Sequence, residues 1–298
     1  MTTTQGDEHA ERFTHLRPLL FTIAYEILGS ATESDDVLQE SYLRWAEVDL
    51  ASVTDTKAYL AQLVTRQALN ALRAQSRRRE DYVGPWLPEP LLTEADPSAD
   101  VVLAESVSMA MLVVLETLSP DERAVFVLRE VFGFGHDEIA STLGKSSASV
   151  RQMAHRAREH VHSRRKRFEP IDAKVSAEIT MQFFAAAATG DLDGLMSMLA
   201  PDVVWTADSD GKVSAARRPV AGAERVAKLI LGLIRLGGPD GRAEPGVYNS
   251  APALVLYTGD RLEGIVSVEI IDGKITNFYA MRNPEKLSTV MLPRRIGR

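Results

Sequence analysis

The chain has 298 residues, a net charge of −7 and no cysteine. The lack of cysteine excludes disulfides, thiol catalysis and cysteine-ligated zinc. No apolar run is long enough to span a bilayer, and the N-terminal stretch "MTTTQGDEHAERF" is too polar and acidic for a signal peptide. The length allows two or three domains, and the default expectation is a cytoplasmic protein without a membrane partner.

Charge is strongly segregated along the chain. Residues 57–80 contain six basic residues and one acidic residue, and residues 143–169 contain eight basic and two acidic residues. The segments before and between these blocks are acidic. Compact basic blocks indicate nucleic-acid contacts, and acidic faces indicate protein contacts or solvated surface. Either block alone is equally compatible with ordinary exposed Lys and Arg side chains.

The first 80 residues are predicted to be helical. Apolar residues recur at helical spacing from about residue 11, and Gly29 can end this first helix. The pattern "TESD" at residues 32–35 predicts a capping box that opens a second helix. Opposite its apolar side, this second helix carries an acidic face, which consists of Asp35, Asp36, Gln39 and Glu40.

A third helix is predicted from Asp55 to Arg77. Its apolar stripe faces the core, and polar residues recur near the helical period on the other side. These polar residues are Arg66, Asn70, Arg73 and Arg77. They are candidates for DNA contact because they fall in the first basic block.

The segment "DYVGPWLPEP", residues 81–90, follows this helix. Its three prolines break helices, but a flexible linker is expected to be rich in Gly and Ser, without a Trp and a Tyr. The segment is therefore predicted to dock on a neighbouring surface. The alternative is a connector in which Trp86 covers only its own domain.

Residues 101–168 are predicted to be helical again. "SPDE" at 119–122 predicts a capping box with proline in the first turn. Further on, Ala140, Gly144 and Val150 have the spacing of a helix-turn-helix, in which a small residue, a turn glycine and a branched apolar residue let two helices cross. An ordinary helical hairpin is the alternative.

The second helix of this motif is expected to start near Ser146. Arg and Gln side chains can recognise base edges, and small side chains allow close approach to the groove. The residues expected to face DNA are Ser147, Ala148, Arg151, Gln152, His155, Arg156 and Arg158.

From about residue 172 the pattern changes to two apolar helices followed by β-rich segments, with one further helix, "AERVAKLILGLIRLG", between the first two β segments. The β segments are "DVVWTA", "GVYNSAPALVLYTG", "LEGIVSVEII" and "KITNFYAM". "IDGK" at 271–274 predicts a tight hairpin turn. This order predicts an α+β cone built on a curved antiparallel sheet.

The stretches "DDVLQESYLRW", "LVTRQALNALRAQSRRR" and "LSPDERAVFVLREVFGFGHDEIASTLGKSSASVRQMAHRARE" resemble the extracytoplasmic-function (ECF) group of sigma-70 family factors. The resemblance implies a multidomain protein with two all-α sigma domains. It places region 2 at residues 1–80, a linker at 81–105 and region 4 with the helix-turn-helix at 106–168. The acidic face would bind the clamp helices of RNA polymerase. The third helix and the loop before it would melt and recognise the proximal promoter element, and the helix-turn-helix would recognise the distal one.

Residues 170–298 resemble SnoaL-like domains of the nuclear-transport-factor-2-like fold. Sigma factors with this extension, including the mycobacterial sigma-J-like subgroup, carry three motifs that appear here as "WLPEP" (86–90), "DSDGK" (208–212) and "NPEKL" (283–287). Ser209 and Asp210 replace glycines of the second motif, and Glu285 replaces Asp in the third. The resemblance implies an interdomain regulatory interface, formed by Trp86, Leu87, Pro88, Asp208, Gly211, Lys212, Asn283, Pro284, Lys286 and Leu287.

The expected partners are core RNA polymerase and promoter DNA. No cofactor, metal or enzymatic activity is expected, a separate anti-sigma protein is not required, and an unknown small-molecule ligand of the C-terminal domain remains open. Two alternatives are a SnoaL-class enzyme or ligand sensor tethered to a DNA-binding module, and a DNA-binding regulator that never joins polymerase. In residues 170–298, which lack His and Cys, acid–base chemistry would fall to carboxylates such as Asp208, Asp210, Glu263 or Glu269. For Asp208, a place in a turn, "DSDG", is favoured over a catalytic role.

Overall fold

The computed structural model describes residues 2–78, 81–93, 100–164 and 173–298. The N-terminal helical unit consists of α1 (Thr2–Leu28), α2 (Ala31–Trp45), the short 3-10 helix η1 (Leu50–Ser52) and α3 (Thr56–Arg78). All three predicted helices are present, and α1 begins well before residue 11. Asp55 caps α3 by accepting a hydrogen bond from the Ala58 N–H at 3.0 Å.

The predicted start of the second helix was wrong. Gly29 ends α1 with a φ of 68°, and Ser30 directly caps α2 through a hydrogen bond from the Glu33 N–H. The left-handed glycine reverses the chain within two residues, so the cap falls on Ser30 and not on Thr32.

The helix-turn-helix unit follows the connector. It consists of α4 (Val101–Ser106), α5 (Met109–Leu115), α6 (Pro120–Phe126), a π-helical turn (Val127–Val131), α7 (His136–Leu143) and α8 (Ser147–Arg164). The capping box of Ser119 and Glu122 is confirmed. Gly144 has a φ of 63°, and the Ser146 hydroxyl caps α8. The predicted turn and helix start are therefore both present.

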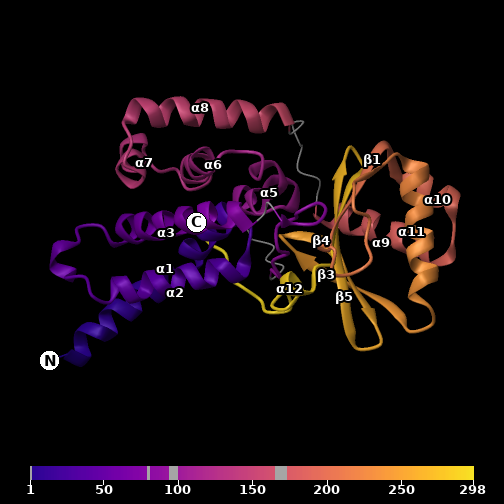
Figure 1. The fold of residues 1–298 in the computed structure, drawn as a ribbon, viewed down its shortest axis with the longest axis horizontal. Coiled ribbons are helices and arrows are strands. Elements are labelled where there is room, and N and C mark those ends of the chain that lie inside the picture. The colour runs from indigo at the N-terminus through magenta and orange to yellow at the C-terminus, as the bar shows by residue number, and fades with distance from the viewer. Residues whose placement is uncertain (1, 79–80, 94–99, 165–172) are drawn as a thin grey trace.

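The C-terminal domain is α+β, as predicted. Its helices are α9 (Ala173–Thr189), α10 (Leu192–Met198), α11 (Ala223–Gly237) and α12 (Pro284–Leu287). Its strands are β1 (Leu199–Asp208), β2 (Val220–Ala221), β3 (Gly241–Tyr248), β4 (Ala251–Thr258), β5 (Arg261–Ile271) and β6 (Lys274–Met281). They form one sheet in the order β2-β1-β6-β5-β4-β3. In Figure 1, α9, α10 and α11 lie on the side of the sheet away from the helical units.

Two details of the sheet differ from expectation. β1 and β6 pair in parallel, which the intervening helix and four strands make possible by returning the chain to the same end. The segment "GVYNSAPALVLYTG" forms two strands joined by a turn at Asn249 and Ser250, both with positive φ. The hairpin turn at "IDGK" is confirmed, with Asp272 and Gly273 in the left-handed region.

Two shared hydrophobic cores join the three units. One core runs from α1–α3 into α4–α8 without interruption. Another joins the sheet face that looks toward the helical units to Leu87 of the connector, Met109 of α5 and Leu287 of α12. A third lies between the sheet and α9–α11. Within the described ranges, no helix combines the length and the apolar character needed to cross a membrane.

Candidate functional site at the domain junction

The connector runs extended between the three units, and Trp86 lies where they meet. The ammonium of Lys286, from α12, lies over the Trp86 ring at 3.8 Å from its centroid. A Cβ added to Gly29, in the turn between α1 and α2, would lie 3.1 Å from the edge of the Trp86 ring. Next to it, Leu87 and Pro88 are buried. Trp86 therefore contacts α12 and lies close to the α1–α2 turn, and the cation–π contact adds to apolar packing.

Asp208 is the centre of this junction. It is the last residue of β1, is 0% exposed, and accepts hydrogen bonds from the Tyr82 hydroxyl, the Leu87 N–H (2.7 Å) and Lys286 Nζ (2.7 Å). A buried carboxylate requires such partners because desolvation of an unpaired charge is costly. Burial, together with the hydrogen bond to Asp208, raises the pKa of Tyr82, so the phenol stays protonated as a donor.

The prediction that Asp208 belongs to a turn was wrong. The turn comes after it, where Asp210 and Gly211 have φ values of 49° and 65°. A Cβ at Gly211 would lie 3.1 Å from Val83, so this glycine permits the connector to pass closely. Asp210 adopts the left-handed conformation in place of a glycine and accepts a hydrogen bond from the Val83 N–H.

Helix α12 brings the third motif to the same point. Asn283 caps the helix and donates from its amide to the Tyr82 hydroxyl at 2.9 Å, while the exposed Pro284 occupies the first turn. Lys286 also donates to the Leu87 carbonyl at 2.6 Å. Lys212 forms more exposed ion pairs with Asp210 (2.9 Å) and Glu285 (2.7 Å). Exposed pairs of this kind contribute little, so the buried Lys286 is the main ionic contact.

A second anchor ties the connector to the α1–α2 turn. Glu89 accepts hydrogen bonds from the Ser30 hydroxyl (2.8 Å) and the Thr32 N–H (3.0 Å), and its own N–H donates to the Gly29 carbonyl (2.8 Å). Its carbonyl accepts from the Tyr25 hydroxyl at 2.7 Å. Glu89 is 8% exposed, so the anchor is shielded from water.

Asn249 extends this anchor to the C-terminal domain. Its amide nitrogen donates to the Tyr25 hydroxyl (2.7 Å) and the Val107 carbonyl (2.8 Å), and its oxygen accepts from the Leu91 N–H (3.0 Å). One side chain from the β3–β4 turn therefore contacts α1, the connector and the segment after α4. Burial raises the pKa of Tyr25, which keeps its hydroxyl protonated.

A buried carboxylate also lies between the two helical units. Glu26 of α1 is 0% exposed and accepts a hydrogen bond from the Ser106 hydroxyl at 2.6 Å. Burial raises its pKa to about 8, against an ordinary value of 4.5. Nearby, the buried Arg123 of α6 donates to the Glu26 carbonyl at 2.7 Å and forms an ion pair with Glu116.

The polar side of α3 faces the helix-turn-helix unit. Arg66 donates to the carbonyls of Ser141 and Thr142, both at 2.9 Å, at the C-terminal end of α7, where cations are favoured. Arg73 forms an ion pair with Asp121 at 2.8 Å. Burial raises the pKa of Asp121, but hydrogen bonds from Lys145 and Arg73 outweigh this effect and lower it below its usual range. Asn70 is exposed, and the side chain of Arg77 lies outside the described residues.

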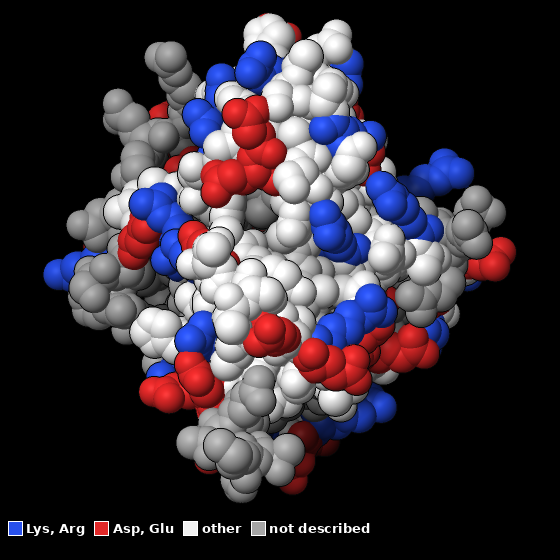
Figure 2. Space-filling model, turned by 90° about the vertical axis from the view of Figure 1, so that its left-hand side faces the viewer, with Lys and Arg blue, Asp and Glu red and all other residues white. Residues whose placement is uncertain are grey.

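The outer side of α8 is exposed but partly neutralised. Ala148, Arg151, Gln152 and His155 are exposed, and the less exposed Ser147 donates to Asp137. Arg156 pairs with Glu122 at 3.1 Å and Arg158 with Glu130 at 2.5 Å. Figure 2 shows Lys and Arg interspersed with Asp and Glu across the end of the molecule that it faces.

The acidic face of α2 is only partly free. Asp36, Gln39 and Glu40 are exposed, whereas Asp35 pairs with Arg17 (3.0 Å) and with Arg294 (2.9 Å). Arg294 belongs to the C-terminal tail, residues 288–298, which lies on the N-terminal helical unit. The Gly297 N–H donates to the Thr22 hydroxyl at 3.0 Å, and Ile296 packs against the helical core.

Comparison with known proteins identifies the family. The model of sigma-70 region 2 matches residues 12–78, and that of sigma-70 region 4 matches residues 108–161. The chain is 37% identical to the ECF RNA polymerase sigma factor SigJ of Mycobacterium tuberculosis, over 93% of this chain and 92% of that protein. The chain belongs to the ECF sigma factors.

Other relatives agree over the full length. The probable ECF sigma factor SigI of M. tuberculosis is 31% identical over 95% of this chain and 96% of its own. The crystal structure of M. tuberculosis SigJ superposes with a TM-score of 0.77 and 34% identity, covering 95% of this chain and 99% of that chain. The sigma factor regions and the C-terminal SnoaL-like domain are thus parts of one shared architecture, and the protein is a sigma factor for promoter-specific transcription initiation.

The ten residues expected at the interdomain interface are brought together by the structure. The residues expected to contact DNA are not: Arg66 and Arg73 face region 4, whereas α8 faces solvent. Sequence analysis missed Tyr25, Glu89 and Asn249, and it noted Tyr82 only as an aromatic residue of the segment expected to dock. Glu89 could have been noticed as a carboxylate between two prolines in a segment expected to dock, and Asn249 as a left-handed turn residue in a long β segment.

In the described part of the chain, no group of carboxylates or histidines is arranged to hold a metal ion.

Replacing Lys286 by Met should lower the free energy of unfolding by about 3–5 kcal/mol, because it leaves the Asp208 charge buried without its cation. The matched control is Lys212→Met, which removes an exposed ammonium and should cost at most about 1 kcal/mol. Urea unfolding of both variants measures the difference. Adding Asp208→Asn to Lys286→Met should restore part of the loss, and equal losses for the two lysines would contradict the assignment of the buried pair.

The stability of the protein should fall with rising pH because of Glu26. Its pKa of about 8 exceeds the ordinary 4.5, so between these values the folded protein holds a proton that the unfolded chain releases. Stability is then lost as pH rises through this window. Glu26→Gln should flatten the dependence of the urea midpoint on pH, and Glu11→Gln, on the exposed side of the same helix, should not. Identical pH profiles for the two variants would rule out this role.

Proposed function

We propose that the C-terminal domain regulates this sigma factor by holding regions 2 and 4 in a closed arrangement. The observation that carries the proposal is the contact of Lys286 with Asp208, Leu87 and Trp86. Through these contacts the C-terminal domain holds the connector. Glu89 of the connector in turn accepts a hydrogen bond from Ser30 of region 2, and Asn249 of the C-terminal domain donates directly to Tyr25 of region 2.

In the closed arrangement, side chains that are expected to contact DNA are bonded to region 4 instead. Arg66 and Arg73 contact region 4, so α3 cannot present them to the proximal promoter element while regions 2 and 4 are packed together. If only one molecule in about a hundred were open, the apparent affinity for promoter and polymerase would fall about a hundredfold. Regulation would follow from any change in this fraction.

The C-terminal tail supports the same proposal at the surface expected to bind polymerase. Arg294 pairs with Asp35 and is itself only 10% exposed at its side chain. A clamp helix that approached α2 would have to displace this guanidinium. The tail and the connector therefore restrain different surfaces, one for polymerase and one for DNA.

An enzymatic role for the C-terminal domain is less well supported. Its strongest acidic candidate, Asp208, is fully buried and committed to three donors from the connector and α12. A general acid or base must instead reach a substrate proton. We propose that the C-terminal domain is a regulatory module, that a separate anti-sigma protein is not required, and that any small molecule acts as an effector and not as a substrate. The Asp208→Asn variant tests this, since loss of a turnover activity without any effect on transcription would favour an enzyme.

Loosening the connector should raise transcription. Run-off transcription with purified core RNA polymerase, on the promoter upstream of the protein's own gene, would compare the full chain with Trp86→Ala and with a chain ending at Val290. Trp86→Ala removes the ring that contacts Lys286 and lies close to Gly29, and the truncation removes Arg294 from Asp35. Both are expected to increase promoter-specific output several-fold at limiting sigma factor.

The control for these variants is Lys212→Met, which alters only exposed ion pairs of the same motif and should transcribe like the unmodified chain. Unchanged output from both Trp86→Ala and the truncation would contradict regulation by closure. No promoter-specific transcript from any of these proteins, despite DNA binding, would instead favour a regulator that does not join polymerase.

Arg151→Ala should weaken binding to the matched promoter by about 1–3 kcal/mol if Arg151 contacts a guanine in both acceptor positions. Arg164→Ala, near the end of α8, should weaken binding to matched and scrambled duplexes alike, as expected for a phosphate contact. Its neighbour Arg165 lies outside the described residues. Fluorescence anisotropy with both duplexes measures the two losses. Equal losses on both duplexes for Arg151→Ala would remove it from base recognition.

A further inference from the structure

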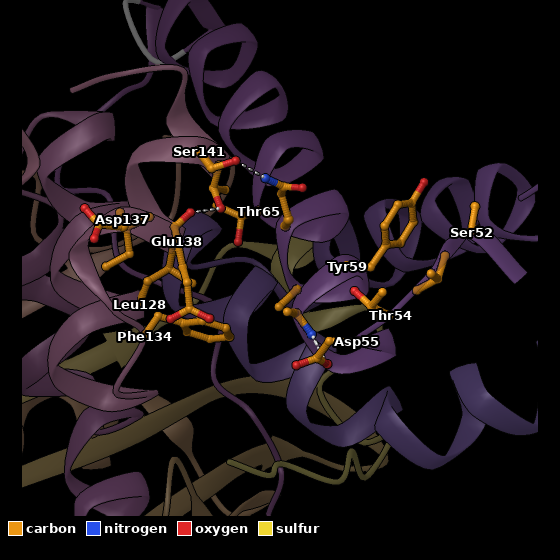
Figure 3. A pocket seen from close by; sticks show the side chains of 16 residues that line it. Ser52, Thr54, Asp55, Tyr59, Thr65, Leu128, Phe134, Asp137, Glu138 and Ser141 are labelled. Atoms are coloured by element: carbon orange, nitrogen blue, oxygen red, sulfur yellow. Dashed lines mark hydrogen bonds between the residues drawn. The ribbon is translucent and has the colours of Figure 1, made fainter. Parts of the chain in front are cut away.

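A cavity of about 460 Å³ lies between regions 2 and 4, away from the connector (Figure 3). Its walls come from η1, the loop before α3 and one side of α3 in region 2, and from the π-helical turn and α7 in region 4. The volume is in the range of small-molecule sites. Because both regions contribute walls, the cavity exists only while they are packed together.

The cavity is acidic. Among the described residues that line it are Asp55, Asp137 and Glu138, and none of the 16 is Lys, Arg or His. Each carboxylate uses one oxygen structurally: Asp55 accepts from the Ala58 N–H, Asp137 from the Ser147 hydroxyl and Glu138 from the Gly135 N–H. No described residue donates to the second oxygen of any of them. A recess lined by one sign of charge concentrates counter-ions of the opposite sign.

Thr65 provides an independent sign of a ligand. It lies on α3, is 0% exposed and lines the cavity, yet its hydroxyl has no hydrogen-bond partner among the described residues. A buried hydroxyl in a helix normally donates to the carbonyl four residues earlier or finds another partner. A polar group in the cavity would satisfy it.

We propose that this cavity binds a linear aliphatic diamine or polyamine. The carboxylates do not converge on one point that could hold a metal ion, so the complementary ligand carries separated positive charges. One charge would lie at Asp55 of region 2 and another at Asp137 and Glu138 of region 4. The rings of Tyr59 and Phe134 supply apolar and π surfaces for the methylene chain and the ammonium groups.

Such a ligand would favour the closed form. It contacts both regions at once, and a ligand that binds one conformation better shifts the population toward it. The amine would thus act as an effector at a place separate from the C-terminal domain. The binding proposal itself does not depend on regulation by closure.

Titration calorimetry of spermidine into the full-length protein, at low ionic strength and without DNA or polymerase, tests the site. Asp55→Asn and Glu138→Gln remove charge but keep their caps, since Asn and Gln serve equally at these positions. Each is expected to weaken binding by about tenfold, the loss of one charge-assisted hydrogen bond. Asp49→Asn is the matched control: Asp49 caps η1 in the same way but does not line the cavity.

A second variant, Thr65→Val, replaces the unpartnered hydroxyl by a methyl group of similar size. It should leave the urea midpoint unchanged or higher and weaken spermidine binding. The proposal is overturned if spermidine does not bind at millimolar concentration. It is also overturned if Asp49→Asn weakens binding as much as the two cavity variants do, because spermidine would then only be neutralising an acidic surface.

Discussion

The buried carboxylate of Asp208 is the constraint on which the domain arrangement depends. A charge that is fully withdrawn from water must be paired and hydrogen-bonded, and its three donors come from two distant segments. Tyr82 and Leu87 belong to the connector, and Lys286 belongs to the last helix. The carboxylate can therefore be satisfied only when β1, the connector and α12 meet. This explains why short motifs about 75 to 120 residues apart in the sequence have to be present together.

The connector turns this local requirement into a restraint on the whole sigma factor. It is held at Asp208 by the C-terminal domain and at Glu89 by the α1–α2 turn, with stiff proline-containing chain between the two anchors. A slack linker would allow either anchor to form alone. Here, a movement of the C-terminal domain would also displace region 2. Asn249 strengthens this coupling, because it donates to Tyr25 of region 2 and accepts from the Leu91 N–H of the connector.

Sequence analysis could predict much of the fold because helices, the turn glycine at 144 and the hairpin at "IDGK" follow from local rules. It could also assemble the members of the junction, since their motifs resemble those of a known family. It could not predict how they interact. The burial of Asp208 results from packing between units, and a pattern such as "DSDG" looks the same in a solvated turn. Likewise, the direction in which Arg66 and Arg73 point depends on where region 4 packs, which no local pattern specifies.

The contacts at the domain junction and those on the side proposed to bind DNA differ in strength for a physical reason. Asp121, Glu122 and Glu130 form ion pairs with Arg73, Arg156 and Arg158, and these pairs are partly exposed and weakened by salt. If these arginines contact promoter DNA as proposed, its phosphates can replace the carboxylates directly, since they offer the same chemistry. The buried anchors at Asp208 and Glu89 have no such competitor, because neither DNA nor polymerase supplies a substitute for Lys286 or Ser30. In the proposed mechanism the buried anchors therefore set the main resistance to opening, and an effector in the cavity between regions 2 and 4 would add to it.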